Sequence, residues 1–197
     1  MLPLSLAASI APLLGAEPSA EEIAKLITIR PGTIPLIVSA PHGGSEVVPD
    51  AAVRVNKDLP RFVTVRDANT YELATKLSDE LEQRLGGKPY LVLAKFARKY
   101  ADANRPAAHS YESDAAKPFY DAYHAALAKY CREIQQKWRA GLLMDIHGQA
   151  AYPDSLLRGT NDGESVELLL MRQTRAAFVG PRSIWGQMES RGYQILP

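Results

Sequence analysis

Three short apolar runs divide the chain. They occupy residues 35–40, 90–96 and 142–147. Short runs rich in branched side chains and bounded by Gly, Pro or polar residues indicate buried strands rather than helices. We therefore expect three buried strands.

Segments with helical spacing lie before and between these runs. Residues 19–27 begin with a serine that can cap a short helix. A second helix is expected over residues 69–84, where Gly86 stops it, and a third over residues 115–139, where Gly141 follows an apolar stripe. Helices that alternate with short apolar strands predict an α/β fold with a mainly parallel sheet.

Polar residues follow each expected strand. In open α/β sheets, ligands bind beyond the carboxyl ends of the strands, so a functional site is expected there. His42 and Glu46 follow the first strand, and His147 ends the third. Two imidazoles and one carboxylate form the ligand set of many catalytic zinc sites. The alternative for His42 and Glu46, judged by spacing alone, is a pair of ordinary hydrogen-bonded loop residues.

Two features support this metal-site hypothesis. Gly43 and Gly44 allow the backbone after the first strand to turn tightly and to approach a ligand closely. Asp145 precedes His147 at the end of an apolar run, where a polar pair needs partners, so Asp145 is a candidate hydrogen-bond partner of an imidazole.

The loop after the second strand carries a different chemistry. It contains Arg98, Asp102, Asn104 and Arg105. A guanidinium can bind a carboxylate through two parallel hydrogen bonds, and an adjacent amide adds donors, so this loop could hold an acidic substrate. An ordinary solvated loop with an Asp–Arg pair remains the alternative.

Composition narrows the classes of partner. The 197 residues suit one domain, and the formal net charge of +1 provides no field for nucleic acid or an anionic membrane. Cys131 is the single cysteine, so neither an internal disulfide nor a CxxC metal knuckle can form. The sequence indicates no particular oligomeric state.

The first residues form an apolar stretch that ends in Leu-Leu-Gly-Ala, which is typical of a secretory signal peptide although no basic residue precedes it. Residues 1–17 are therefore expected to be a signal peptide or a disordered segment. No other stretch is apolar enough for a membrane span. The expected location is periplasmic or secreted, with a cytoplasmic location as the alternative.

Four segments in order, SAPHGGSEVVP, RKYADANRP, LLMDIHG and LLRGTNDG, resemble the N-formylglutamate amidohydrolase family, which is related in fold to zinc carboxypeptidases and aspartoacylases. Asp67 with residues 70–74 resembles a further family segment. The resemblance implies a three-layer α/β/α hydrolase fold over residues 18–197, one zinc ion, and hydrolysis of an amide in an N-acyl amino acid or peptide.

The resemblance also assigns roles to residues. His42, Glu46 and His147 match the metal ligands, and Asn104 and Arg105 match a segment that binds the substrate carboxylate. Arg98 would polarise the scissile carbonyl or contact that carboxylate, and Asp102 would orient the loop. Arg158 is a further candidate for substrate binding, with a solvated strand end as the alternative.

One expected element of the family is missing from the sequence. Related enzymes place a catalytic glutamate late in the chain, whereas Glu164, Glu167 and Glu189 match no such segment. We expect a catalytic domain that lacks its C-terminal part. A zinc amidohydrolase is the leading hypothesis, and the alternatives are a zinc peptidase or cell-wall amidase and a non-catalytic binding domain that retains the metal pocket.

Overall fold

The computed structural model describes residues 18–196. It divides into two compact units, one that runs to Gly148 and one that begins at Gln149. The expected signal peptide over residues 1–17 lies outside the described residues. Within the described part, no helix is long and apolar enough to cross a membrane.

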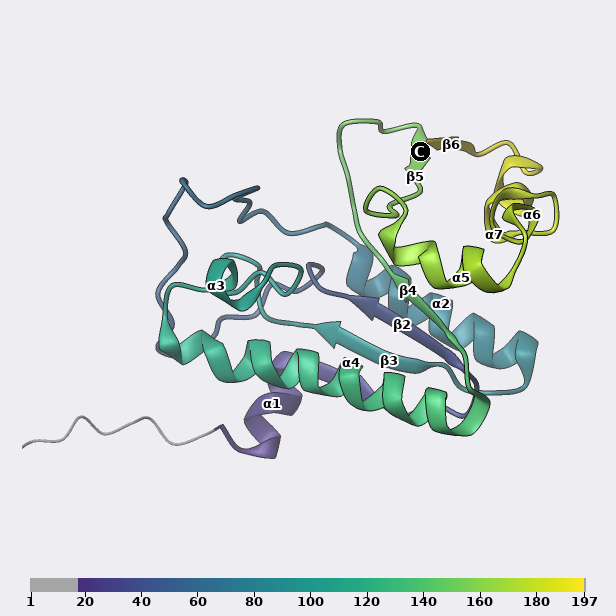
Figure 1. Ribbon diagram of the computed structural model, residues 1–197. Coiled ribbons are helices and arrows are strands. Elements are labelled where there is room, and N and C mark those ends of the chain that lie inside the picture. Colours follow the sequence, from purple (N-terminus) through teal and green to yellow (C-terminus); the bar gives the residue numbers. More distant parts are fainter. Residues whose placement is uncertain (1–17, 197) are drawn as a thin grey trace, which may run out of the picture. The chain divides into compact units, whose positions relative to one another are not determined.

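A four-stranded sheet forms the centre of the first unit (Figure 1). Its strands, in spatial order, are β1 (Ile27–Arg30), β3 (Tyr90–Ala94), β2 (Leu36–Ala40) and β4 (Leu142–Asp145). The pairs β2–β3 and β2–β4 are parallel, and β1 is antiparallel to β3. The expected mainly parallel sheet is therefore present.

Helices cover both faces of this sheet, as Figure 1 shows. Successive side chains of a strand point to opposite faces. Tyr90 and Val92 of β3 accordingly pack in the cluster that includes Phe119 and Tyr123 of α4 (Lys117–Trp138). Leu91 and Leu93 pack in a second cluster, against α2 (Thr70–Leu85). The first unit is thus a three-layer α/β/α arrangement, in agreement with the expected architecture.

Local sequence explains where the helices begin and end. α1 (Ala20–Leu26) begins at a capping box, in which the Ser19 hydroxyl accepts a hydrogen bond from the backbone N–H of Glu22. α2 ends at Gly86, whose φ of 69° lies in the left-handed region that glycine adopts without strain. The expectation that helix α1 includes Ile27 differs from the structure, because Ile27 begins β1.

Strand β4 differs from the expected buried strand. Leu142 and Leu143 are each 45% exposed. Among the described residues, β4 pairs with β2 alone and is the last strand of the sheet. An edge position leaves one side of a strand without a neighbouring strand, which explains the exposure.

The remaining elements are short. The first unit also contains α3 (Ala107–Ser110) and the 3-10 helix η1 (Asp114–Ala116). In the second unit, β5 (Ser155–Leu157) pairs in parallel with β6 (Gln194–Leu196). The helices of this unit are η2 (Glu164–Val166), α5 (Glu167–Arg172), α6 (Arg175–Val179) and α7 (Ile184–Glu189).

Candidate metal site

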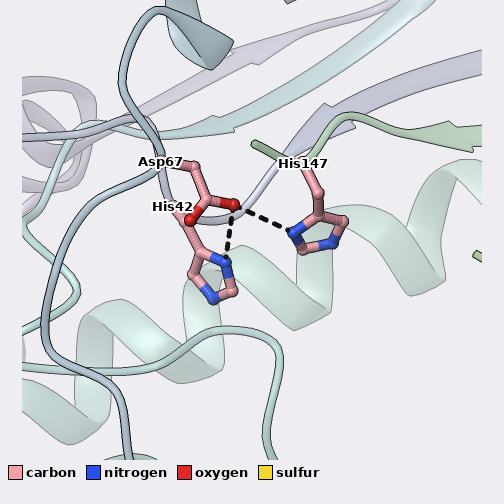
Figure 2. Close-up of side chains that lie close together, drawn as sticks. All are labelled: His42, Asp67 and His147. Carbon is pink, nitrogen blue, oxygen red and sulfur yellow. Dashed lines mark hydrogen bonds and ion pairs between the residues drawn. The ribbon is translucent and has the colours of Figure 1, made fainter. Parts of the chain in front are cut away.

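Three side chains meet beyond the carboxyl ends of the parallel strands. His42 follows β2, His147 follows β4, and Asp67 lies just before α2. One ligand atom from each lies within 4.8 Å of the other two, which makes these residues a group that could hold a metal ion. Figure 2 shows both imidazoles turned toward the same carboxylate.

His42 is held from the side opposite Asp67. The residue is 1% exposed. Nε2 lies 2.7 Å from Asp102 Oδ1, and because a carboxylate only accepts, Nε2 must carry the hydrogen and donate it. Nδ1 is buried without a hydrogen-bond partner in the described structure, and it lies 3.4 Å from Asp67 Oδ2.

His147 has the same arrangement in a more exposed place. Its Nε2 donates to Asp145 Oδ2 at 3.0 Å, and its Nδ1 lies 3.3 Å from Asp67 Oδ2. Burial lowers the pKa of His147, but hydrogen bonds to Asp145 and Asp67 outweigh this effect and raise the pKa to about 9. In the metal-free protein, the two carboxylates therefore hold a proton on this imidazole.

The geometry shows why these groups could hold a cation. Since each Nε2 donates to its own carboxylate, a neutral imidazole presents a lone pair at Nδ1. Both Nδ1 atoms face Asp67 Oδ2, so three electron-pair donors would converge on one point and repel one another without a proton or a metal ion among them. In the metal-free protein, the proton held on His147 relieves this repulsion. Burial raises the pKa of Asp67, but the hydrogen bond from His147, the nearby His42 and the N–H of Gly148 lower it further, so Asp67 is ionised.

Asp67 is fixed by its backbone surroundings. Its N–H donates to the carbonyl of His42 at 3.0 Å, and its Oδ2 accepts from the N–H of Gly148 at 3.0 Å. A Cβ atom at Gly148 would lie 3.1 Å from the Asp67 Cβ, which is tight. Gly148 thus lets the chain after β4 pass close to Asp67.

Gly43 and Gly44 have a packing role. A Cβ at Gly43 would lie 2.4 Å from the backbone nitrogen of Tyr71, and one at Gly44 would lie 2.1 Å from the carbonyl oxygen of Lys95. The close approach of the backbone is made to α2 and to the residues after β3, and the expected approach to a ligand stays a prediction. This packing places His42 beside the start of α2.

Glu46 is placed differently from the expected third ligand. It is absent from the potential metal-binding group found in the described residues, and its side chain is exposed. The backbone of Glu46 donates to Lys95 O and accepts from Ala97 N, both at 2.8 Å. These bonds hold it alongside the segment after β3, and Asp67 supplies the carboxylate that faces the two histidines.

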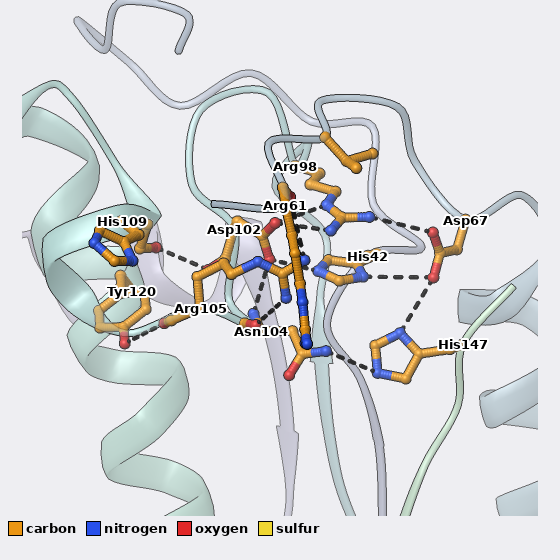
Figure 3. Close-up of polar contacts among 12 residues, drawn as sticks. His42, Arg61, Asp67, Arg98, Asp102, Asn104, Arg105, His109, Tyr120 and His147 are labelled. Carbon is orange, nitrogen blue, oxygen red and sulfur yellow. Dashed lines mark hydrogen bonds and ion pairs between the residues drawn. The ribbon is translucent and has the colours of Figure 1, made fainter. Parts of the chain in front are cut away.

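Asp102 is the hub of a buried charged network, shown in Figure 3. Besides His42, its carboxylate binds Arg98, whose Nε and one terminal nitrogen lie 2.9 and 2.8 Å from Oδ2. Burial raises the pKa of Asp102, but the hydrogen bond from His42, together with the charge and hydrogen bond of Arg98, lowers it well below its usual range. Arg98 also lies 3.7 Å from Asp67 Oδ1, so its guanidinium lies between the two carboxylates.

Asn104 and Arg105 lie on the open side of this network. Asn104 Nδ2 is 3.4 Å from His147 Nε2, and its backbone N–H donates to Asp102 Oδ1 at 3.0 Å. The half-buried Arg105 donates to the carbonyls of Asn104, at 2.7 Å, and Arg61, at 3.3 Å. Arg105 Nε is buried without a partner in the described chain. This donor could serve a ligand.

The other candidates lie in the second unit. The guanidinium of Arg158 lies 5.6 Å from the centre of the Phe178 ring. Glu164, Glu167 and Glu189 are exposed, in η2, α5 and α7. The substrate-binding role expected for Arg158 stays a prediction.

Comparisons with known proteins identify the fold. No protein-family model matches the chain, and no curated protein matches it either. Among solved structures, the N-formylglutamate amidohydrolase from Ralstonia eutropha JMP134 is similar, with a TM-score of 0.58 and 19% sequence identity. The similarity covers 87% of this chain and 75% of that protein. The chain therefore shares the fold of an N-formylglutamate amidohydrolase, in agreement with the resemblance found in its sequence.

Proposed function

We propose that this protein is a zinc-dependent amidohydrolase that cleaves the amide bond of an N-acyl amino acid, with His42, Asp67 and His147 as the metal ligands. The observation that carries the proposal is the convergence of both Nδ1 atoms on Asp67 Oδ2, at 3.4 and 3.3 Å. The shared fold with an N-formylglutamate amidohydrolase supports the same activity class.

The residues present fit a zinc ion. Zinc binds imidazole nitrogen and carboxylate oxygen, and a catalytic site keeps one position open beside three protein ligands. The buried, unpartnered Nδ1 of His42 is a lone pair that the fold has removed from water, which is costly without a cation to bind. Bound zinc would supply a Lewis acid for the amide carbonyl and would lower the pKa of a water molecule.

The protein's own residues would orient the reaction. Asp102 and Asp145 fix the two imidazoles by accepting from their Nε2 atoms, so the Nδ1 atoms keep their direction. Arg98 lies between Asp67 and Asp102 and would hold both carboxylates. Its donors face these carboxylates, so we assign it support of the ligands in place of direct contact with the substrate carbonyl.

Substrate recognition would use the open side of the network. Asn104 is exposed beside His147, and Arg105 retains an unpartnered Nε–H. Together they would bind the carboxylate of the amino-acid part, because a guanidinium suits a planar carboxylate. This arrangement would place an acidic group of the substrate next to the metal ligands.

Metal content tests the ligand set. We would measure zinc by elemental analysis in the wild type, Asp67→Ala and His147→Ala, with Glu46→Ala as the matched carboxylate control. About one zinc ion per chain is expected in the wild type and in Glu46→Ala, and a strong loss in the other two. Zinc lost from Glu46→Ala but retained in Asp67→Ala would reverse the assignment.

Turnover tests the reaction. The same samples would be assayed with N-formylglutamate, acetylated amino acids and peptidoglycan fragments. Hydrolysis of an N-acyl amino acid, lost together with the zinc, is the expected result. Cleavage of peptidoglycan fragments alone would favour a cell-wall amidase, and full zinc occupancy without any turnover would favour a binding domain.

A further inference from the structure

Arg54 is a buried cation that the proposed reaction does not use. It lies in the long segment between β2 and α2 and is 2% exposed, although its neighbours Val53 and Val55 are 42% and 71% exposed. A guanidinium is rarely buried unless it has partners. Burial lowers the pKa of Arg54, and the charge of Asp102 acts in the opposite direction.

Three backbone carbonyls from different segments accept hydrogen bonds from Arg54. One terminal nitrogen donates to Val63 O at 3.1 Å and to Arg98 O at 3.3 Å, and the other donates to His109 O at 3.3 Å. Its guanidinium also lies 5.1 Å from the centre of the Phe62 ring. One side chain thus joins the segment before α2 to the residues after β3 and to α3.

The same guanidinium reaches the charged network of the site. A terminal nitrogen lies 3.8 Å from Asp102 Oδ2, on the carboxylate that holds His42. Residues 54–66, in the segment before α2, are called the 54–66 loop. This loop also meets the substrate side, since Arg105 donates to its Arg61 carbonyl at 3.3 Å. Arg54 therefore contacts both the loop and the support of a metal ligand.

We propose that Arg54 is a positioning residue that fastens the 54–66 loop to the Asp102–His42 pair and so sets both the order of the loop and the affinity of the metal site. The second part rests on the proposed function. The first part concerns the metal-free protein and stands apart from it.

Arg54→Lys is the informative change. Lysine keeps the positive charge, but its compact ammonium cannot span three carbonyls as a planar guanidinium does. Arg30→Lys is the matched control, because Arg30 also joins distant segments, from β1 to Ser78 and Asp79 of α2. Thermal unfolding of both variants would measure the general loss of stability.

Two measurements would be made on each protein. Hydrogen exchange in metal-free protein would follow the amides of the 54–66 loop and of Asp67, whose N–H donates to His42 O. Zinc affinity would be measured by competition with a chromophoric chelator. For Arg54→Lys we expect exchange at these amides to become about tenfold faster or more. We expect its zinc affinity to fall about 10- to 100-fold. Arg30→Lys should change neither beyond about twofold.

The outcomes separate the two proposals. Unchanged loop exchange and unchanged zinc affinity in Arg54→Lys would overturn the positioning role, as would equal changes in Arg30→Lys. A wild type that binds no zinc would overturn the proposed function, and the exchange data alone would then decide whether Arg54 fastens the loop to the Asp102–His42 pair.

Discussion

The two histidines face one carboxylate oxygen, yet their surroundings differ. His42 and Asp102 are 1% and 0% exposed, and Arg98 and Arg54 enclose them with positive charge. The side chains of His147 and Asp145 are 35% and 32% exposed, at the edge of the sheet. One imidazole is therefore part of the core, whereas the other is held at the surface.

The largest expected effect is a difference in stability. It separates the loss of Asp102 from the loss of Asp145, the carboxylates that hold the two imidazoles. Asp102→Ala should lower the free energy of unfolding of the metal-free protein by about 3–5 kcal/mol, because it leaves buried cations without their carboxylate. Asp145→Ala should cost about 1 kcal/mol, because water replaces a partly exposed partner. Urea unfolding measures both values, and equal losses would show that burial does not distinguish the two supports.

Asp102 and Asp145 should contribute about equally to the affinity for zinc. Asp102→Asn and Asp145→Asn each remove the charge that orients an imidazole, so each should weaken zinc binding about 10- to 100-fold. Competition with a chelator measures this effect, and Asp79→Asn, which alters an exposed partner of Arg30, is the control. An affinity within twofold of the wild type in Asp145→Asn would remove Asp145 from the site.

Ser39 is a buried hydrogen-bond partner of the partly exposed Asp145. Its hydroxyl is buried, donates to Asp145 Oδ1 at 2.5 Å and is also hydrogen-bonded to the buried Tyr123. Ser39→Ala should cost about 1–2 kcal/mol in urea unfolding, because Tyr123 loses a partner and Asp145 loses a donor. Ser45→Ala, at an exposed position in the same segment, is the control and should change stability by less than about 0.5 kcal/mol.

The smallest expected effect concerns Glu112, an exposed residue that is hydrogen-bonded to the start of the 54–66 loop. The N–H groups of Asn56 and Val55 donate to Glu112, and these bonds lower its pKa. Its charged form therefore stabilises the fold fully above the unfolded pKa of about 4.3, and this contribution is lost as pH falls through the lower folded pKa. The melting temperatures of wild type and Glu112→Gln should differ by a constant amount above about pH 5 and converge below about pH 4. A difference that grows on acidification would contradict this role.

Much of the fold could be predicted because its elements carry local signals. The helices α2 and α4 have apolar stripes, and glycine marks the end of α2. Strand β1 was not expected, because Ile27 follows α1 without a breaker and fits the helical spacing equally well. The exposure of β4 was also missed, because an apolar run does not reveal whether a strand has one neighbour or two.

The site could be predicted only in part. Because parallel strands end at the same edge of a sheet, His42 and His147 were expected to lie close together. Asp67 was recognised only through a resembling segment and not as a possible ligand, because it lies in a long irregular stretch without periodicity. Arg54 gave no signal at all, since an arginine in an irregular stretch without periodicity is usually solvated.

The edge position of β4, late in the chain, also sets the order in which the residues of the site come together. Ser39 and Asp145, which pair across β2 and β4, are 106 positions apart in the chain, whereas His42 and Asp102 are 60 apart. A chain that emerges N-terminus first can gather His42, Asp67 and Asp102 before β4 exists. His147 is then the last of the three proposed ligands to arrive, so the capture of a metal ion by all three would report that synthesis and folding of the first unit are complete.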